Sequence, residues 1–317
     1  MGIDGLSAGI LFADVACAPI DRLPNPGELQ PASYIQLGLG GCAANVAVDL
    51  AKVGVKVGVA GCVGDDSFGD VVVRQLESGG ADTRGVHRIA GIGTACTMIV
   101  NVKGCDRRFI STPGANHRFT VEHIPADWVR EAKVFYVGGY LMMPKLQTEA
   151  LVDLFRTARR AGAKTVLDVV LLGGENHAKT LAQILPQTDV FLPNTDESAV
   201  ITGLTDPLQQ AEHFRAAGAR TVVITQGQRG SLLVSGHLRL RAGVYPIEVV
   251  GGAGSGDAFD AGYIAGLLAG EGPEGCLRWG SALGASCVRA IGTTESVFHR
   301  AEAEAFLRQH DLAVEKF

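Results

Sequence analysis

The chain has 317 residues, of which 47% are hydrophobic and 19% are charged, and this is enough to bury one large α/β core or two smaller ones. A net charge of −5 excludes the basic surface that binding to nucleic acid or to acidic membranes requires. Seven cysteines without a CxxC pair, no N-terminal signal pattern and no apolar run of about 18 residues predict a cytoplasmic protein with reduced thiols.

The first element expected along the chain is a buried strand. The apolar run from Gly9 to Ala13 predicts it, and Asp14 follows at the strand end, where α/β sheets place ligand-binding side chains. Taken alone, Asp14 is equally well explained as a turn residue. Residues 15–38 then contain prolines, an asparagine and one alternating, edge-type strand. We expect this excursion to stand off the main body of the protein.

A helix with small residues at its start is expected next, over residues 40–54. Gly40 and Gly41 would let a ligand approach the backbone closely, because they carry no Cβ. Asn45 supplies the one polar side chain of the first turn. By itself, Asn45 is equally well explained as a helix cap.

Two β-rich runs within residues 93–113 predict a hairpin. With the excursion at 15–38, this hairpin predicts a small β-sheet lid. From about residue 134 onward, apolar runs alternate with helical segments, which is the pattern of a parallel sheet with helices on both faces. No low-complexity linker divides the chain, so we expect residues 1–317 to form a single doubly wound α/β domain with the lid built from insertions.

The sequence VVGGAGSGDAFDAGYIAGLLAG, residues 249–270, carries the strongest chemical signal. Its helix is apolar on nearly every side, which predicts burial. Gly254, Ser255 and Gly256 at its start leave backbone N–H groups free to bind an anion. Asp257 beside them would repel a phosphate, but it is suited to accept the proton of a substrate hydroxyl. Taken alone, the loop is equally well explained as a glycine-rich turn with a capping Asp.

Two other kinds of phosphate-binding loop do not fit this stretch. A Walker loop requires a lysine, and none occurs between Arg241 and Arg278. A dinucleotide fold requires a βαβ unit around the loop, whereas only about sixty residues follow it and most have a helical pattern.

Two further polar groups follow predicted strands. Asn194 and Glu197, in PNTDES, lie three residues apart on the first turn of a helix. Spacing alone favours an ordinary capping pair, and beside a phosphate site the pair would orient Mg²⁺ through its waters. Thr225, Gly227 and Gly230, in ITQGQRG, would surround a nucleotide's phosphates and ribose, although they also suit a simple hairpin turn.

These motifs, in this order, resemble those of the ribokinase-like (PfkB) carbohydrate kinases. GAGSGDAFDAGYIAGLL is similar to the C-terminal signature of that family, GGCAANVA to its N-terminal signature, PNTDES to its NxxE motif and ITQGQRG to its TxGxxG loop. The resemblance covers nearly the whole chain, with STPGANHRF and GTTESV in the expected places. It implies a mostly parallel sheet with helices on both faces, a β lid, and a homodimer formed through the lids.

The resemblance also implies ATP-dependent transfer of a phosphoryl group to a primary hydroxyl of a sugar or sugar-like substrate. Asp257 would be the general base, for which an ordinary carboxylate pKa suffices because the proton leaves late. The N–H groups of residues 254–256 would stabilise the transferring phosphoryl group. The other matched residues would bind the acceptor (Asp14, Gly40, Gly41 and Asn45), the nucleotide (Asn194, Glu197, Thr225, Gly227 and Gly230) and, through water on Glu197, Mg²⁺.

Some features depart from the family pattern. Gly251 stands where the family commonly has an Asp that helps to hold a monovalent ion, so K⁺ is a weaker expectation than Mg²⁺. Cys42 stands where ribokinases usually have Lys, which leaves the identity of the sugar open. A nucleoside kinase of the same fold and a non-catalytic sugar-binding relative are the alternatives. We expect His117 to be a solvated loop residue rather than a substrate ligand.

Overall fold

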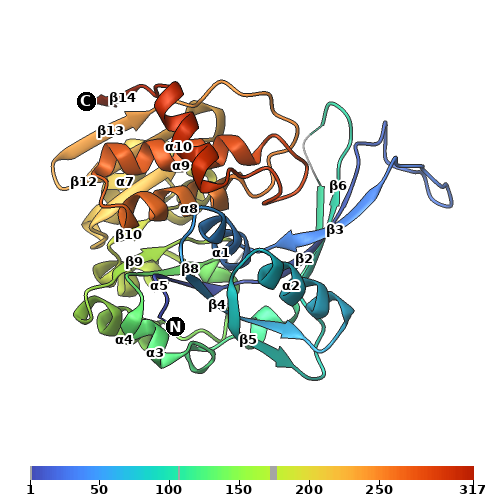
Figure 1. Cartoon of the computed structure of the whole chain (residues 1–317), viewed down its shortest axis with the longest axis horizontal. Helices are drawn as coiled ribbons and strands as arrows, with labels where there is room; N and C mark the ends of the chain where they lie inside the picture. Colours follow the sequence, from blue (N-terminus) through green and yellow to red (C-terminus); the bar gives the residue numbers. More distant parts are fainter. Residues whose placement is uncertain (1, 106–107, 172–176) are drawn as a thin grey trace.

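The computed structural model describes residues 2–105, 108–171 and 177–317. Within them the chain forms a ten-stranded sheet and a separate four-stranded sheet. Figure 1 shows the small sheet projecting from one side of the larger α/β body. None of the helices in this part of the chain has the length and apolar character needed to cross a lipid bilayer.

The strands of the large sheet are mostly parallel. They are β1 (Gly5–Gly9), β4 (Val57–Gly64), β5 (Asp82–Ile89), β8 (Val134–Gly138), β9 (Lys164–Leu167), β10 (Val190–Phe191), β11 (Thr221–Thr225), β12 (Ser231–Ser235), β13 (Leu238–Ala242) and β14 (Val314–Lys316). Their order is β14-β13-β12-β11-β10-β9-β8-β1-β4-β5, and every neighbouring pair from β11 to β5 is parallel. The carboxyl ends of these parallel strands meet at one edge of the sheet, where α/β proteins bind ligands.

Helices cover both faces of this sheet, as the alternating pattern predicted. One core contains residues of α1 (Cys42–Lys52), α2 (Ser67–Ser78), α8 (Ser255–Leu268), α9 (Pro273–Cys287) and α10 (Arg300–Gln309). The other contains residues of α3 (Ala126–Glu131), α4 (Thr148–Arg160), α5 (His177–Ile184), α6 (Thr195–Thr202) and α7 (Pro207–Ala216). Short 3-10 turns are η1 (Gly114–Arg118), η2 (Val121–His123), η3 (Tyr140–Met142), η4 (Leu185–Gln187) and η5 (Gly227–Arg229).

Helix α8 is largely enclosed near the ligand-binding edge. Its residues from Ala258 to Gly266 are all buried, which confirms the burial predicted from its apolar sequence. It packs against both α1 and α9, and Figure 1 shows α1 and α8 side by side although they lie far apart in the sequence. Gly262 lets α9 come this close, because an added Cβ would overlap the carbonyl of Trp279. Helix α8 is therefore packed closely between α1 and α9.

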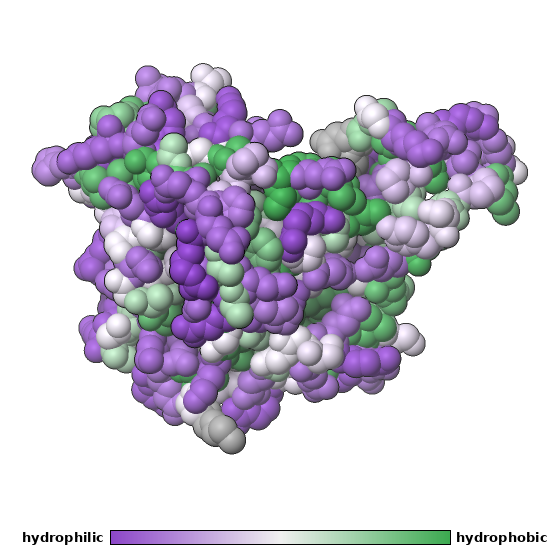
Figure 2. Space-filling view, turned by 45° about the horizontal axis from the view of Figure 1, so that its top comes forward, coloured by the Kyte–Doolittle hydropathy of each residue, from purple (hydrophilic) through white to green (hydrophobic). Residues whose placement is uncertain are grey.

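The small sheet contains β2 (Phe12–Cys17), β3 (Ile35–Gly40), β6 (Cys96–Val100) and β7 (Arg108–Thr112), in the order β3-β2-β6-β7. Its strands come from within or next to the segments 15–38 and 93–113 that were expected to form a lid. Strands β6 and β7 are the antiparallel hairpin predicted there, and residues 106 and 107 between them lie outside the described residues. Figure 2 shows a hollow between this lid and the rest of the molecule, with hydrophobic residues around it.

One predicted strand is wrong. The expected strand from Gly9 to Ala13 is two strands, because β1 ends at Gly9 and the chain turns before β2 enters the lid. The buried side chain of Asn116 holds this turn: its Nδ2 donates to the carbonyl of Leu11 and its Oδ1 accepts from the N–H of Leu11, both at 3.0 Å. Asp14 therefore lies within a lid strand and not at the end of a strand of the main sheet.

Candidate active site

A cavity of about 630 Å³ lies at the carboxyl edge of the main sheet, below the lid. Its walls come from lid strands β2, β6 and β7, from the start of α1, from the segments that follow β9 and β10, from the last residue of β11, and from the glycine loop and first turns of α8. Elements from both halves of the chain thus meet there. The lining contains nine of the residues predicted to act together, namely Asp14, Gly41, Asn45, Asn194, Glu197, Thr225, Gly254, Gly256 and Asp257.

Asp257 lies in the first turn of α8 and contacts α1 directly. Its Oδ2 accepts a hydrogen bond of 2.7 Å from Nδ2 of Asn45. Asn45 is buried in the first turn of α1, so the contact joins the starts of two helices. This geometry is more than a helix cap, because α8 has no side-chain capping bond at its start.

The start of α8 also presents backbone N–H groups. Gly254, in the left-handed conformation, precedes the helix, and its carbonyl accepts the first helical bond, from the N–H of Ala258. The N–H groups of Ser255, Gly256 and Asp257 therefore have no partner among the described residues. An added Cβ at Gly256 would meet nothing within 4 Å. The start of α8 therefore offers free N–H groups beside open space, as an anion-binding loop would require.

Thr293 orients the amide of Asn45. Its Oγ1 lies 3.0 Å from Oδ1 of Asn45 and donates to the carbonyl of Leu39 at 2.6 Å. With Oδ1 on the Thr293 side, the Nδ2 donors of Asn45 face Asp257. The loop that carries Thr293 also packs on Gly254, where an added Cβ would overlap the Thr293 carbonyl. Thr293 belongs to the GTTESV motif but was not among the predicted site residues.

The pKa of Asp257 differs from the ordinary value expected for it. Burial raises the pKa of Asp257, while hydrogen bonds from Asn45 and Cys42 lower it. The rise has a physical cause in the enclosed position of the carboxyl group between α1 and α8. A base with a raised pKa binds a proton more tightly, so Asp257 is better matched to neutral pH than a solvated carboxylate.

Asp14 faces the cavity from the lid. Burial raises the pKa of Asp14 to about 7, the negative charge of Asp257 adds to the rise, and a hydrogen bond from Thr97 opposes it. Gly40 is not among the residues that line the cavity. It lies against Asp14, because an added Cβ at Gly40 would overlap the Asp14 carboxyl group. Gly41 has a φ of 90°, and its Cβ would lie 2.5 Å from the carbonyl of Ile10.

Asn194 and Glu197 form the capping pair that their spacing favoured, and they also line the cavity. Oδ1 of Asn194 accepts from the N–H of Glu197 and Oε2 of Glu197 accepts from the N–H of Asn194, each at 2.9 Å. Burial raises the pKa of Glu197 to about 7. Thr225 lies beside Asn194 because the ends of β10 and β11 are bridged there.

Gly227 begins η5, the turn that follows β11, and Gly230 comes directly after η5. Neither glycine is among the residues that line the cavity. Gly230 has a φ of 84°, and an added Cβ there would overlap the carbonyl of Ala242. These glycines shape the turn that follows Thr225. Ser255 also points elsewhere, since its Oγ donates to the carbonyl of Gly252 at 3.0 Å.

Two lining carboxylates were missed by the sequence reasoning. Asp168 directly follows β9, and its Oδ2 accepts from the N–H of Gly139 at 3.1 Å. Asp260 lies one turn after Asp257 and accepts a bond of 3.2 Å from the Tyr136 hydroxyl. Burial raises the pKa of both groups well above the usual range. Both carried signals in the sequence: Asp168 ends an apolar strand, and Asp260 is three positions beyond Asp257 on a helix.

Cys42 lies between two of these acids. Its Sγ and one carboxyl oxygen each of Asp168 and Asp257 lie within 4.8 Å of one another. Burial raises the pKa of the Cys42 thiol, so it stays protonated and donates to the carboxylates. A protonated thiol is a poor metal ligand, whereas the carboxyl oxygens of the cavity suit Mg²⁺.

The cavity is strongly acidic. The described residues that line it include five carboxylates (Asp14, Asp168, Glu197, Asp257 and Asp260) and no Lys, Arg or His. A triphosphate would be repelled here unless cations and backbone N–H groups compensate its charge. The donor set therefore fits a divalent cation bound together with phosphate.

A family model described as pfkB family carbohydrate kinase matches residues 7–300. The chain belongs to this family. The ribokinase of Haemophilus influenzae is 27% identical over 291 residues, which cover 89% of this chain and 91% of the relative. The 5-dehydro-2-deoxygluconokinase of Geobacillus kaustophilus is 26% identical over 321 residues, which cover 97% and 94%. The structure of Arabidopsis thaliana ribokinase with ribose and ATP has a TM-score of 0.82 at 23% identity and covers 97% of this chain and 99% of that one.

Membership of the pfkB family confirms the resemblance, the fold class and the assignment as a sugar kinase. The names of the relatives differ in the acceptor, so the family does not fix it. Of the departures from the family pattern, Cys42 lines the cavity. At Gly251 an added Cβ would lie 2.5 Å from the carbonyl of Ala290, so this loop has no room for the missing Asp. His117, in η1, is half-buried and is not among the lining residues.

Replacing Asn45 by Ala should raise the pKa of Asp257, because it removes a hydrogen bond that stabilises the carboxylate. A base works only when deprotonated, so the acidic limb of the kcat/KM profile should move to higher pH by about one unit. The measurement is phosphoryl transfer from pH 5 to pH 9. Ser255→Ala is the control, because the Ser255 hydroxyl is turned to the carbonyl of Gly252 and its loss leaves the Asn45 bond in place. An unshifted limb in the Asn45 variant would show that this hydrogen bond does not govern the base.

Replacing Asp14 by Asn should stabilise the protein without ligands at pH 8 but not at pH 4. Burial raises the pKa of Asp14 to about 7 in the folded protein, well above that of a solvated aspartate, so the folded state loses relative stability as pH rises from about 4 to 7. At pH 8 the variant should gain roughly 1 to 3 kcal/mol in the free energy of unfolding. Urea unfolding at both pH values measures the difference, with Asp65→Asn, an exposed change outside the cavity, as the control. An equal gain at both pH values would contradict the assignment.

Proposed function

We propose that this chain transfers the γ-phosphoryl group of ATP to a primary hydroxyl of a sugar or sugar-like acceptor, with Asp257 as the general base. The observation that carries the proposal is the placement of the Asp257 carboxylate in the cavity, beside N–H groups of its own helix that have no partner among the described residues. Such a carboxylate accepts a proton from an attacking hydroxyl. The N–H groups at residues 254–256 stabilise charge on the transferring phosphoryl group.

The acceptor is bound between the lid and α1. Asp14 reaches the cavity from β2, and Asn45 and Gly41 reach it from the start of α1. Carboxylate oxygens accept hydrogen bonds from neighbouring sugar hydroxyls, and glycine lets the ring approach the backbone. Gly40 contributes indirectly, by leaving room for the Asp14 carboxyl group. These groups hold the acceptor hydroxyl near Asp257.

ATP is bound at the ends of β10 and β11. Asn194, Glu197 and Thr225 line this part of the cavity, and the turn shaped by Gly227 and Gly230 follows Thr225. The phosphate end of the nucleotide then points toward the start of α8, where the helix dipole favours negative charge.

Mg²⁺ is the cofactor that the acidic cavity fits, and it neutralises phosphate charge when bound. Glu197 would hold it through water, as a cation that keeps much of its hydration shell. Asn194 fixes the orientation of Glu197 through their reciprocal hydrogen bonds.

A nucleoside acceptor is the second candidate, and the lid gives it specific support. Phe12 and Phe109 line the cavity together with Ile99 and Met142, so part of the wall is aromatic and aliphatic. Such a wall suits the flat face of a base as well as the carbon face of a sugar.

An acceptor panel separates these candidates. The purified protein would be supplied with Mg–ATP and with ribose, fructose, 2-keto-3-deoxygluconate, 5-dehydro-2-deoxygluconate, adenosine and inosine. ADP release that depends on one of the sugars supports the proposal, and release that depends only on a nucleoside supports the second candidate. Acceptor binding without turnover across a broad panel would instead indicate a non-catalytic relative.

Replacing Asp257 by Asn should lower kcat by about 10² to 10⁴ with little change in the KM of the acceptor, because only the proton acceptor is lost. Steady-state kinetics with the best acceptor measure this. Ser255→Ala is the matched control in the same loop, since its hydroxyl is turned to Gly252 and the backbone N–H is retained. Turnover of the Asp257 variant close to that of the control would show that another group is the base.

A homodimer through the lids is also proposed, because the outer lid face carries an apolar row. Leu37, Val15, Met98 and Ile110 are cross-strand neighbours, and the side chains of Met98 and Ile110 are exposed by 50% and 66%. Met98→Lys/Ile110→Lys should therefore convert a dimer to a monomer in light scattering, whereas Val200→Lys, at an exposed site on α6, should not. A monomeric wild type would refute the proposal.

A cytoplasmic location and a single working domain complete the proposal. All seven cysteines are free, which suits a reducing compartment. The cavity draws on both halves of the chain, so residues 1–317 would act as one unit.

A further inference from the structure

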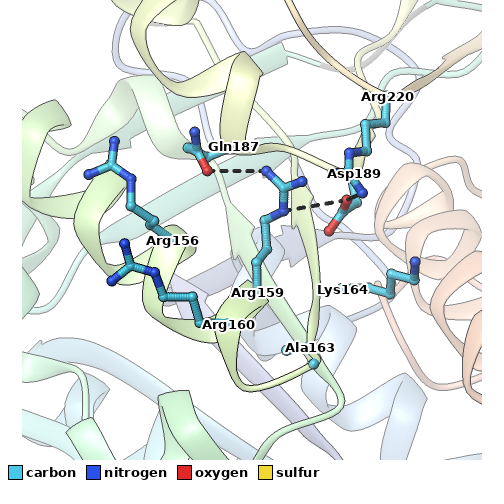
Figure 3. Close-up of a pocket in the computed structure, with 9 residues that line it drawn as sticks. Arg156, Arg159, Arg160, Ala163, Lys164, Gln187, Asp189 and Arg220 are labelled. Atoms are coloured by element: carbon cyan, nitrogen blue, oxygen red, sulfur yellow. Dashed lines mark hydrogen bonds and ion pairs between the residues drawn. The ribbon is translucent and has the colours of Figure 1, made fainter.

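A second cavity lies at the opposite edge of the main sheet. It has a volume of about 400 Å³ and is lined by Arg156, Arg159, Arg160, Lys164 and Arg220 together with Gln187 and Asp189 (Figure 3). Lys164 begins β9, while Asp189 and Arg220 directly precede β10 and β11. The kinase site is at the other ends of the same three strands. None of the residues assigned to that site lines this cavity.

The charge of this cavity is opposite to that of the kinase site. Five basic side chains line it and Asp189 is the one carboxylate among the lining residues. The whole chain carries a net charge of −5, so this is a local concentration of positive charge on an acidic protein. Clustered cations repel one another, and a bound anion would remove that cost.

Part of the cluster is fixed before any ligand binds. Arg159 donates from Nη1 to the carbonyl of Pro186 and to Oε1 of Gln187, both at 3.1 Å. Nε of Arg159 and Nη1 of Arg220 lie 3.7 and 3.2 Å from Oδ1 of Asp189. The other oxygen of Asp189 accepts from the N–H of Thr165 at 3.0 Å. The buried Asp189 thus holds two guanidinium groups at the edge of the sheet.

Other donors in the cluster are uncommitted. Arg160 and Lys164 have no hydrogen bond or ion pair from their side chains to any described residue, and Arg156 has a single ion pair, with Asp153. Figure 3 shows Arg156 and Arg160 on one side of Arg159 and Arg220 on the other. Arg159 and Arg160 lie in the last turn of α4, where the helix dipole favours basic side chains. The dipole does not explain the positive charges of Lys164 and Arg220, which lie outside that helix.

We propose that this cavity, here named the arginine cavity, is a binding site for a small phosphate-bearing anion. Guanidinium groups form paired hydrogen bonds with phosphate oxygens, and several of them together favour a ligand with two or more phosphate charges. The volume suits a sugar phosphate, a bisphosphate or a nucleotide. A nucleic acid is disfavoured because the surrounding protein is acidic. This site is independent of the proposed kinase function.

The test is calorimetric titration of the full-length protein with pyrophosphate and with fructose 1,6-bisphosphate in EDTA. Without Mg²⁺ the acidic kinase site should not retain these anions, so binding reports the arginine cavity. We expect saturable binding that weakens at least tenfold in Arg160→Glu/Lys164→Glu and falls with added salt. Arg74→Glu, an exposed change on α2, should bind like the wild type.

The proposal would be overturned by no saturable binding of either anion to the wild type, or by equal binding to all three proteins. Tighter binding of poly-glutamate than of either phosphate compound would also overturn it, by assigning the cavity to an acidic protein segment. Phosphoryl transfer by Arg160→Glu/Lys164→Glu, assayed with Mg–ATP and the best acceptor, should match the wild type. That control confirms that the variant is folded and separates failure of this proposal from failure of the kinase assignment.

Discussion

The hydrogen bond between Asn45 and Asp257 is the contact on which the functional part of this molecule depends. It joins the first turns of α1 and α8, whose sequences lie 212 residues apart. Other contacts place each helix start. Helix α8 is buried against α9, and α1 begins next to Gly41, whose backbone packs directly against the carbonyl of Ile10. The bond then fixes the carboxylate beside the N–H groups of its own helix. Under the proposed function, a base and an anion site would thus be held together by helix packing, with little left to side-chain adjustment.

The acidity of the cavity is a cost of this arrangement. Five carboxylates share an enclosed space, and for four of them, Asp14, Asp168, Glu197 and Asp260, both burial and neighbouring negative charge raise the pKa. The protein without ligands is therefore less stable near neutral pH than the same fold with neutral side chains would be. Under the proposed function, phosphates with a divalent cation, and an acceptor whose hydroxyls donate hydrogen bonds, would relieve that repulsion. Part of the binding free energy would then come from repulsion that folding has already introduced.

The features that could be predicted from the sequence lie within one short stretch. Those that depend on contacts between distant parts of the chain were missed. The glycine loop and Asp257 occupy one short stretch, and the apolar helix after it could only be buried, so both were found. The spacing of the PNTDES pair favoured a capping pair, and the structure has that cap, since spacing determines a cap. The role of the pair in binding nucleotide and Mg²⁺, which came from the family resemblance, stays a prediction. The path from β1 into the lid was not predicted, because the turn there is held by Asn116, about a hundred residues away. Asp168 and Asp260 were missed although their positions at a strand end and a helix turn were readable.

The misplaced strand changes how the site is understood, because it moves Asp14 from the rigid sheet to the lid. Asp14 and Asp257 then belong to different parts of the molecule, and the charge of Asp257 raises the pKa of Asp14 across the space between them. Two carboxylates that repel each other oppose a close approach of the lid to the body. Under the proposed function, an acceptor that donates hydroxyl protons to both would bridge lid and body and replace repulsion with hydrogen bonds. The acceptor would then complete the enclosure in which its own hydroxyl reacts. A water molecule is too small to bridge Asp14 and Asp257, so it would not close the site in this way.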